Sequence, residues 1–231
     1  MGFVLKKEVK IFPSIRIGDA ATMTTTKWDV ECVIYDCDGV LFDSLDANSR
    51  LYNYIATSSG RGPLDREELW YCHTHTVYES INHLFKHDGK LEQKALDLLK
   101  TVNLGDFVVY LKMEPNLLET LITLKERKIG RAISTNRTTS MKYIMERFSL
   151  SPHFDMVVTA LDVKHPKPHP ESVEKILETL HFDRKKTVYI GDSGVDRETA
   201  LSSGVKFVAY KNREIAEDGL INDHRELLDF L

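Results

Sequence analysis

The sequence has few cysteines, no long apolar run and no excess of basic residues. Its cysteines are Cys32, Cys37 and Cys72. They include no Cys-x-x-Cys pair, which argues against a disulfide framework or a structural zinc site and suits a reducing compartment. No apolar stretch approaches the roughly 20 residues that a transmembrane helix needs. Residues 1–7 lack the apolar core of a signal peptide, so we expect a cytoplasmic protein with no membrane partner.

The charge balance argues against nucleic acid as a partner. Lys and Arg number 31 against 35 Asp and Glu, a net charge of -4, and the basic residues are spread along the chain. No basic field therefore points to a polyanion. Hydrophobic residues make up 42% of the 231 residues, enough for a globular protein with a sizeable core. Both a monomer and a homodimer are compatible with this composition.

The hydrophobic pattern divides the chain into three parts. Residues 1–27 mix short alternation with a Thr-rich run, and they form an N-terminal extension of undecided order. Residues 45–113 carry apolar side chains at helical spacing, separated by Gly-containing turns, which predicts a helical insert. Residues 28–44 and 114–231 alternate short apolar runs with helices, and the last clear strand is expected at residues 205–210. This alternation predicts an α/β protein with a doubly wound parallel sheet.

Polar residues follow the predicted strands. In open α/β sheets, ligands bind beyond the carboxyl ends of the strands. Taken singly, each group of polar residues after a strand could be a turn or a helix cap. Because such groups follow several successive strands, together they indicate a ligand-binding site. Its candidate residues are Asp36, Asp38, Thr135, Asn136, Lys167 (with Lys164 as the less favoured alternative), Asp192 and Asp196.

This set is suited to phosphoryl transfer. Asp36 and Asp192, from different strands, can hold a Mg²⁺ ion that also takes phosphate oxygens. A carboxylate can attack phosphorus and form an acyl phosphate. Asp38 is placed to protonate the leaving group and later to deprotonate the attacking water. The phosphoryl group would be positioned by Lys167, the Thr135 hydroxyl and the backbone N–H groups of Thr135 and Asn136.

The same residues resemble the four motifs of the haloacid dehalogenase superfamily. Residues 36–44 look like its first motif, and Thr135, Lys167 and residues 191–196 match the second, third and fourth in order. The resemblance covers roughly residues 30–210 and implies a Rossmann-like core. The roles that it implies are nucleophile and metal ligand for Asp36, acid/base and backbone-carbonyl ligand for Asp38, metal ligand for Asp192, metal support for Asp196, and phosphoryl binding for Thr135 and Lys167.

The helical insert resembles the C1 cap of that superfamily. A cap closes over the site, excludes water and contacts the leaving part of the substrate. Candidates for such contacts are His73, His75 and Thr76, just before a predicted helix, and Arg61 in a Gly-Arg-Gly turn. For each of them the alternative is an exposed loop residue or, for Thr76, a helix cap.

The resemblance implies a Mg²⁺-dependent phosphatase that acts on a small phosphate monoester, similar to phosphoglycolate or a sugar phosphate. Asp38 argues against the metal-free dehalogenases and the phosphonatases, which lack an acid there. A sugar phosphomutase is the alternative, although such enzymes usually carry an acid where this chain has Gly191. A phosphoacceptor signalling domain or a catalytically silent binding protein is a more distant alternative, because receiver domains are about half this length and lack the insert and the second aspartate.

Overall fold

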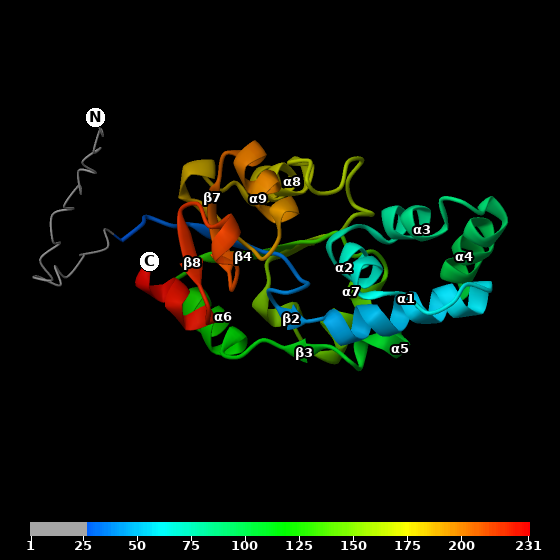
Figure 1. The fold of residues 1–231 in the computed structure, drawn as a ribbon. Helices are drawn as coiled ribbons and strands as arrows, with labels where there is room; N and C mark the ends of the chain where they lie inside the picture. Colours follow the sequence, from blue (N-terminus) through cyan, green and yellow to red (C-terminus); the bar gives the residue numbers. More distant parts are fainter. Residues whose placement is uncertain (1–26) are drawn as a thin grey trace, which may run out of the picture.

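The computed structural model describes residues 27–231, and the expected extension at residues 1–27 lies outside them apart from Lys27. Six parallel strands form one sheet in the order β5-β4-β1-β6-β7-β8 (Figure 1). The sheet strands are β1 (Cys32–Tyr35), β4 (Gly130–Ser134), β5 (Met156–Val158), β6 (Thr187–Gly191), β7 (Lys206–Tyr210) and β8 (Gly219–Ile221).

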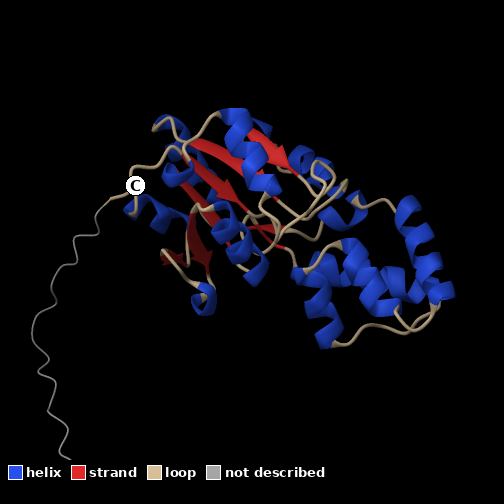
Figure 2. Cartoon of the chain, turned by 90° about the horizontal axis from the view of Figure 1, so that it is seen from above, coloured by secondary structure: helices blue, strands red, loops and turns tan. Residues whose placement is uncertain are grey.

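Helices cover both faces of this sheet (Figure 2). Successive side chains of a strand point to opposite faces, so Val33 and Tyr35 belong to one apolar cluster and Cys32 and Ile34 to the other. The first cluster includes residues of α6 (Leu117–Glu126) and α7 (Ser140–Arg147), and the second includes residues of α8 (Glu171–Leu180) and α9 (Gly194–Ser203). Burial on both faces explains the continuous apolar run of β1. The predicted doubly wound parallel sheet is confirmed.

The C-terminal end of the sheet extends further than the sequence predicts. The expected last strand at residues 205–210 corresponds to β7, and β8 follows it at the edge. Its three residues lie between Asp218 and Asn222, and so short a run gives no period-two signal. Short 3-10 helices occupy Ser151–His153, Arg184–Lys186, Arg213–Ile215 and His224–Asp229.

Five helices lie between the short antiparallel strands β2 (Phe42–Asp43) and β3 (Lys112–Met113). They are α1 (Leu45–Ser59), α2 (Arg66–Thr74), α3 (Val77–Phe85), α4 (Gly89–Thr101) and α5 (Gly105–Val108). Helices α1–α4 lie to one side of the sheet (Figures 1 and 2). Their buried apolar residues, among them Ile55, Ile81 and Phe85, form a third cluster distinct from the two that cover the sheet.

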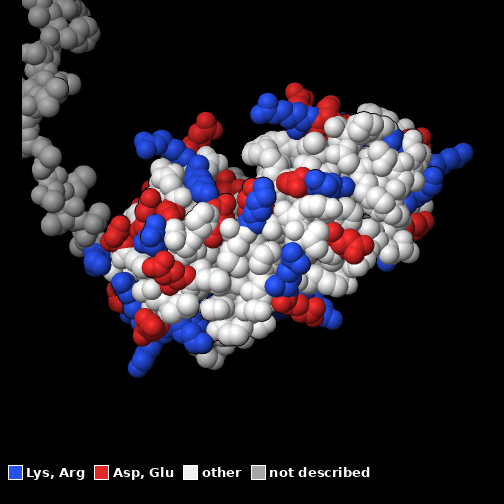
Figure 3. Space-filling view, turned by 90° about the horizontal axis from the view of Figure 1, so that it is seen from below, with Lys and Arg blue, Asp and Glu red and all other residues white. Residues whose placement is uncertain are grey.

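The surface carries charges of both signs. On the face drawn in Figure 3, Lys and Arg side chains lie among Asp and Glu side chains rather than in one basic patch. Within residues 27–231, every helix is too short or too polar to cross a bilayer.

Candidate active site

The turn after β1 carries Asp36 and Asp38 to the carboxyl edge of the sheet. The Asp36 N–H continues the ladder by donating to the Ile190 carbonyl at 3.0 Å. Gly39 then adopts a φ of 71°, and a Cβ at this position would collide with the carboxylate of Asp192. Glycine is therefore required, both for the left-handed backbone and for the close approach of the two loops. This turn places the first and the fourth motif against each other.

Lys167 links three buried side chains of the site. Its Nζ donates to Asp36 Oδ1 at 2.7 Å, to Asp196 Oδ1 at 2.6 Å and to the Tyr189 hydroxyl at 3.0 Å. The Tyr189 hydroxyl in turn lies 3.2 Å from the Ser134 carbonyl, so it fixes the ammonium group against β4. Tyr189 was not predicted as a site residue, because its place in the middle of β6 indicated an ordinary core side chain.

Three carboxylates surround a position suited to a divalent cation. One oxygen each from Asp36, Asp192 and Asp196 lies within 4.8 Å of the others. Burial, together with the neighbouring carboxylates, raises the pKa of Asp36 and of Asp192, although Lys167 opposes this. One lysine does not compensate three close carboxylates, whereas a Mg²⁺ ion with oxygen ligands would. The donor set therefore fits the Mg²⁺ expected from the sequence.

Thr135 and Asn136 are buried or half-buried beside this cluster, but their donors differ from the prediction. The Thr135 N–H donates to the Val158 carbonyl at 3.0 Å, so it is not available to a phosphoryl group. The predicted phosphoryl contact from this N–H is therefore not supported. The Asn136 side chain bonds the Lys167 backbone in both directions, at 3.0 and 3.1 Å. The Thr135 hydroxyl accepts from the Arg137 N–H at 3.1 Å and keeps its own hydrogen to donate. Asn136 thus holds the lysine loop in place.

Arg137 forms a two-point ion pair with Asp38. Its Nε donates to Asp38 Oδ2 at 2.7 Å and its Nη2 to Asp38 Oδ1 at 2.6 Å. Burial alone would raise the pKa of Asp38, but the charge and hydrogen bonds of Arg137 outweigh it and lower the pKa to about 2. The Asp38 carboxylate is thus held by Arg137 and is not one of the three clustered carboxylates. Arg137 was missed, and its only signal was its position directly after Thr135 and Asn136.

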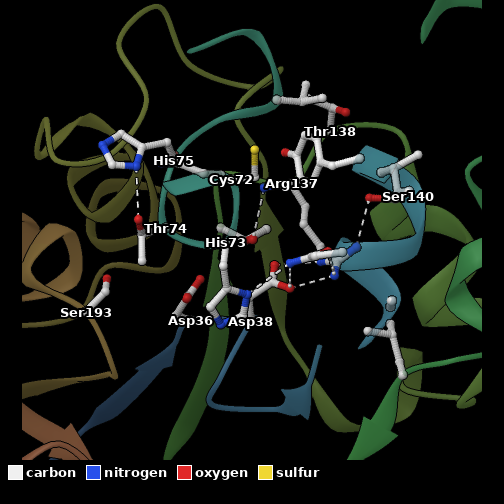
Figure 4. Close-up of a pocket in the computed structure, with 18 of the residues that line it drawn as sticks. Asp36, Asp38, Cys72, His73, Thr74, His75, Arg137, Thr138, Ser140 and Ser193 are labelled. Atoms are coloured by element: carbon white, nitrogen blue, oxygen red, sulfur yellow. Dashed lines mark hydrogen bonds and ion pairs between the residues drawn. The ribbon is translucent and has the colours of Figure 1, made fainter. Parts of the chain in front are cut away.

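A cavity between the sheet edge and the helical insert joins these groups (Figure 4). Asp36, Asp38 and Lys167 line it from the sheet, and His73 and His75 line it from the end of α2. Asn48 Nδ2 on α1 lies 3.3 Å from Asp38 Oδ1 and 3.2 Å from His73 Nδ1. The His75 ring stacks on Tyr71 at 3.8 Å. The predicted residues His73 and His75 therefore face the same space as the nucleophile candidate.

Arg61 and Thr76, the other two cap candidates, are outside the cavity wall and engaged within the insert. Arg61 donates to both carboxylate oxygens of Glu68. Thr76 caps α3, accepting from the Glu79 N–H at 3.2 Å while the Glu79 carboxylate accepts from the Thr76 N–H at 2.9 Å. This capping box satisfies backbone donors of the first helical turn. The expectation that Arg61 and Thr76 contact the substrate is therefore not supported by their placement.

Comparison with known proteins places this geometry in a family. The sequence model of the haloacid dehalogenase-like hydrolases matches residues 33–210. A HAD-superfamily hydrolase of subfamily IA, variant 1, from Geobacter sulfurreducens is 37% identical, and its crystal structure gives a TM-score of 0.77 over 87% of this chain and 100% of that one.

Two curated relatives are more distant but span about three quarters of the chain. Pyrophosphatase PpaX from Bacillus pumilus is 25% identical over 179 residues, which cover 77% of this chain and 81% of the relative. Phosphoglycolate phosphatase from Aquifex aeolicus is 27% identical over 179 residues, covering 75% of this chain and 81% of the relative. With the family match extending over most of the sheet and the whole insert, this chain belongs to the haloacid dehalogenase-like hydrolases.

Proposed function

We propose that the protein is a Mg²⁺-dependent phosphatase of small phosphorylated molecules, working through a phosphorylated Asp36. The observation that carries this proposal is the convergence of Asp36, Asp192, Asp196 and Lys167 at one wall of the cavity between the sheet edge and the insert. The names of two relatives, a pyrophosphatase and a phosphoglycolate phosphatase, support a small phosphorylated substrate.

Asp36 acts as the nucleophile. One carboxylate oxygen attacks phosphorus, the bond from phosphorus to the leaving oxygen breaks, and an aspartyl phosphate forms. The hydrogen bond from Lys167 Nζ to Asp36 Oδ1 orients the carboxylate, and the Thr135 hydroxyl donates to the phosphoryl group. A bound Mg²⁺, held by Asp36, Asp192 and the Asp38 carbonyl with Asp196 in support, would neutralise charge on the transferred group.

Asp38 acts as the acid and then as the base. Its carboxyl gives a proton to the leaving oxygen in the first step. In the second step it takes a proton from the water that attacks phosphorus, the bond to Asp36 breaks, and inorganic phosphate leaves. Because Asp38 is ion-paired with Arg137 in the structure, its protonation requires that the substrate loosen this pair.

Residues 45–113 act as the cap. They supply Asn48, His73 and His75 to the cavity, which gives this insert the contacts with the leaving group. Closure of the cap over the bound substrate would exclude water other than the attacking one and would strengthen the electrostatic interactions in the cavity. The sugar phosphomutase is not favoured, because both curated relatives described above are named for the hydrolysis of phosphate compounds.

The test is phosphate release from a panel of sugar phosphates, nucleotides, pyrophosphate and phosphoglycolate, with Mg²⁺ and with EDTA. Release should require Mg²⁺ and should fall by about 10³-fold or more in Asp36→Asn. Asp97→Asn on the exposed side of α4 serves as the matched control and should retain activity. Isomerisation of a sugar phosphate with no phosphate release would favour the mutase, and activity that survives in Asp36→Asn would contradict the mechanism.

A further inference from the structure

The cavity is lined by a second cationic side chain, whose position the proposed hydrolysis does not explain. Among the described residues that line it, Lys167 and Arg137 are the two with permanently charged cationic side chains. Lys167 is bound to Asp36 and Asp196, at the wall where the phosphoryl group is transferred. Arg137 is bound to Asp38, at the side where the leaving oxygen must lie. We propose that Arg137 binds an anionic group on the leaving part of the substrate, an assignment that rests on the proposed function and deepens it.

The geometry of the acid fixes where the leaving group lies. A group that gives a proton to the leaving oxygen must come within hydrogen-bond reach of it. Asp38 is that group, and two nitrogens of Arg137 lie 2.6 and 2.7 Å from its oxygens. The part of the substrate that lies one or two atoms beyond the leaving oxygen is therefore close to the Arg137 guanidinium.

The guanidinium retains donors for such a group. Arginine has five N–H donors in one plane, and the edge formed by Nε and Nη2 is bound to Asp38. The other contacts are long, at 3.3 Å from Nη1 to the Ser140 hydroxyl and 3.4 Å from Nη2 to the Asn48 carbonyl oxygen. Hydrogen bonds at this distance are weak and readily exchanged. The edge formed by Nη1 and Nη2 can thus bind a carboxylate or a phosphoryl group at two points.

His73 adds a second polar side chain to the same subsite. The amide nitrogen of Asn48 lies 3.3 Å from Asp38 Oδ1, and its amide oxygen lies 3.4 Å from Arg137 Nη2. The same nitrogen lies 3.2 Å from His73 Nδ1, which leaves the other ring nitrogen, Nε2, for a ligand. Figure 4 shows His73 and Arg137 on either side of Asp38.

The rest of the cap wall mixes apolar and polar side chains. Its apolar side chains are Leu51, Leu104, Phe107, Val108 and Leu111. Tyr52, Thr74 and His75 line the same space and add polar groups. A short chain that ends in one anion would satisfy Arg137. Substrates of this class are phosphate esters with a leaving-group carboxylate and anhydrides with a second phosphoryl group.

The test compares matched substrates in matched variants. Phosphoglycolate is paired with 2-hydroxyethyl phosphate, its neutral analogue, and pyrophosphate with methyl phosphate. Within each pair, the leaving part is anionic in the first compound and uncharged in the second, and we call the two compounds the anionic and the neutral partner. We expect at least one anionic partner to exceed its neutral partner in kcat/KM by about 30-fold or more, the effect of one buried charge pair. Arg137→Gln should abolish this preference mainly by raising KM, Arg137→Lys should restore part of it, and exposed Arg213→Gln should keep it. Preference for phosphoglycolate assigns a carboxylate, and preference for pyrophosphate assigns a phosphoryl group.

Binding without turnover separates this inference from the proposed function. In Asp36→Asn, the anionic compound should raise the melting temperature more than its neutral partner does, and adding Arg137→Gln should remove the difference. That result supports the subsite even if no compound is hydrolysed. Equal binding of both partners, or a preference for the anionic substrate that Arg137→Gln leaves unchanged, overturns the subsite even if Asp36-dependent hydrolysis is found.

Discussion

The sheet edge and the helical cap use their polar residues in opposite ways. At the sheet edge, Lys167 donates to both Asp36 and Asp196 although the three are distant in sequence, and each is buried. In the cap, Arg61 and Thr76 bond residues three to seven positions away and stabilise the insert itself. A parallel sheet gathers its strand-end residues at one edge through its topology. In a helical insert, by contrast, the packing of the helices determines which side chains face the cavity.

The largest expected effect is the loss of Lys167, which breaks the sheet-edge cluster. Lys167→Met leaves buried carboxylates without their cation, and unfolding free energy should fall by about 3–5 kcal/mol while phosphate release is lost. Mg²⁺ should recover part of the stability because it replaces the missing positive charge. Chemical denaturation with and without Mg²⁺ measures this, and a variant as stable as the wild type would show that the cluster is not strongly coupled.

The apolar core of the sheet and that of the cap should respond differently to equivalent substitutions. Ile133 on β4 and Ile81 on α3 are both fully buried, so each change to Ala should cost about 2–5 kcal/mol locally. Because Ile81 belongs to the separate cap cluster, Ile81→Ala should speed hydrogen exchange in α1–α4 and leave the sheet protected. Ile133→Ala should speed exchange throughout. Exchange mass spectrometry decides, and equal patterns would mean that cap and core unfold together.

His224 should make the stability of the core depend on pH. Its Nε2 lies 2.9 Å from the Val40 carbonyl, and its buried Nδ1 has no partner among the described residues. Burial lowers its pKa from 6.5 to about 4. Between these values the unfolded chain binds a proton that the folded protein does not, so stability should decrease as pH falls from about 6.5 to 4, by up to about 3 kcal/mol.

A variant with a ring that does not titrate isolates this contribution. His224→Phe retains a flat ring against Tyr210, which lies 4.6 Å from the His224 ring. The difference in unfolding free energy between wild type and variant at pH 8 should shrink at pH 5. A constant difference across this range would show that His224 does not titrate with folding.

The smallest effect is expected for Arg61. Its ion pair with Glu68 is partly exposed, so Arg61→Gln should cost about 1 kcal/mol or less. Because Arg61 lies outside the cavity wall, kcat/KM should change less than about twofold. A tenfold loss of kcat/KM at unchanged stability would show that Arg61 contacts the substrate. Arg61 would then contribute to the substrate site, as is proposed for Arg137, and not only to the stability of the insert.

Sequence alone determined the sheet and its strand-end residues. Apolar runs such as Val33–Tyr35, each followed by an acid or a hydroxyl, indicate buried parallel strands, and parallel strands share one functional edge. Asp36, Asp192 and Lys167 could therefore be chosen as candidates before their contacts were known. Short edge elements such as β8 could not, because three residues carry no periodic signal.

Only the tertiary structure decided which other side chains join the site. Tyr189 has the pattern of a core residue, and its hydroxyl matters only because β6 lies beside β1 and so brings it to Lys167. Arg137 belongs to the site because it is bound to Asp38, which is 99 positions away in the sequence. Hydrogen bonds and ion pairs act over about 3 Å in space, and a local pattern in the chain does not encode which distant side chains the fold brings within that distance.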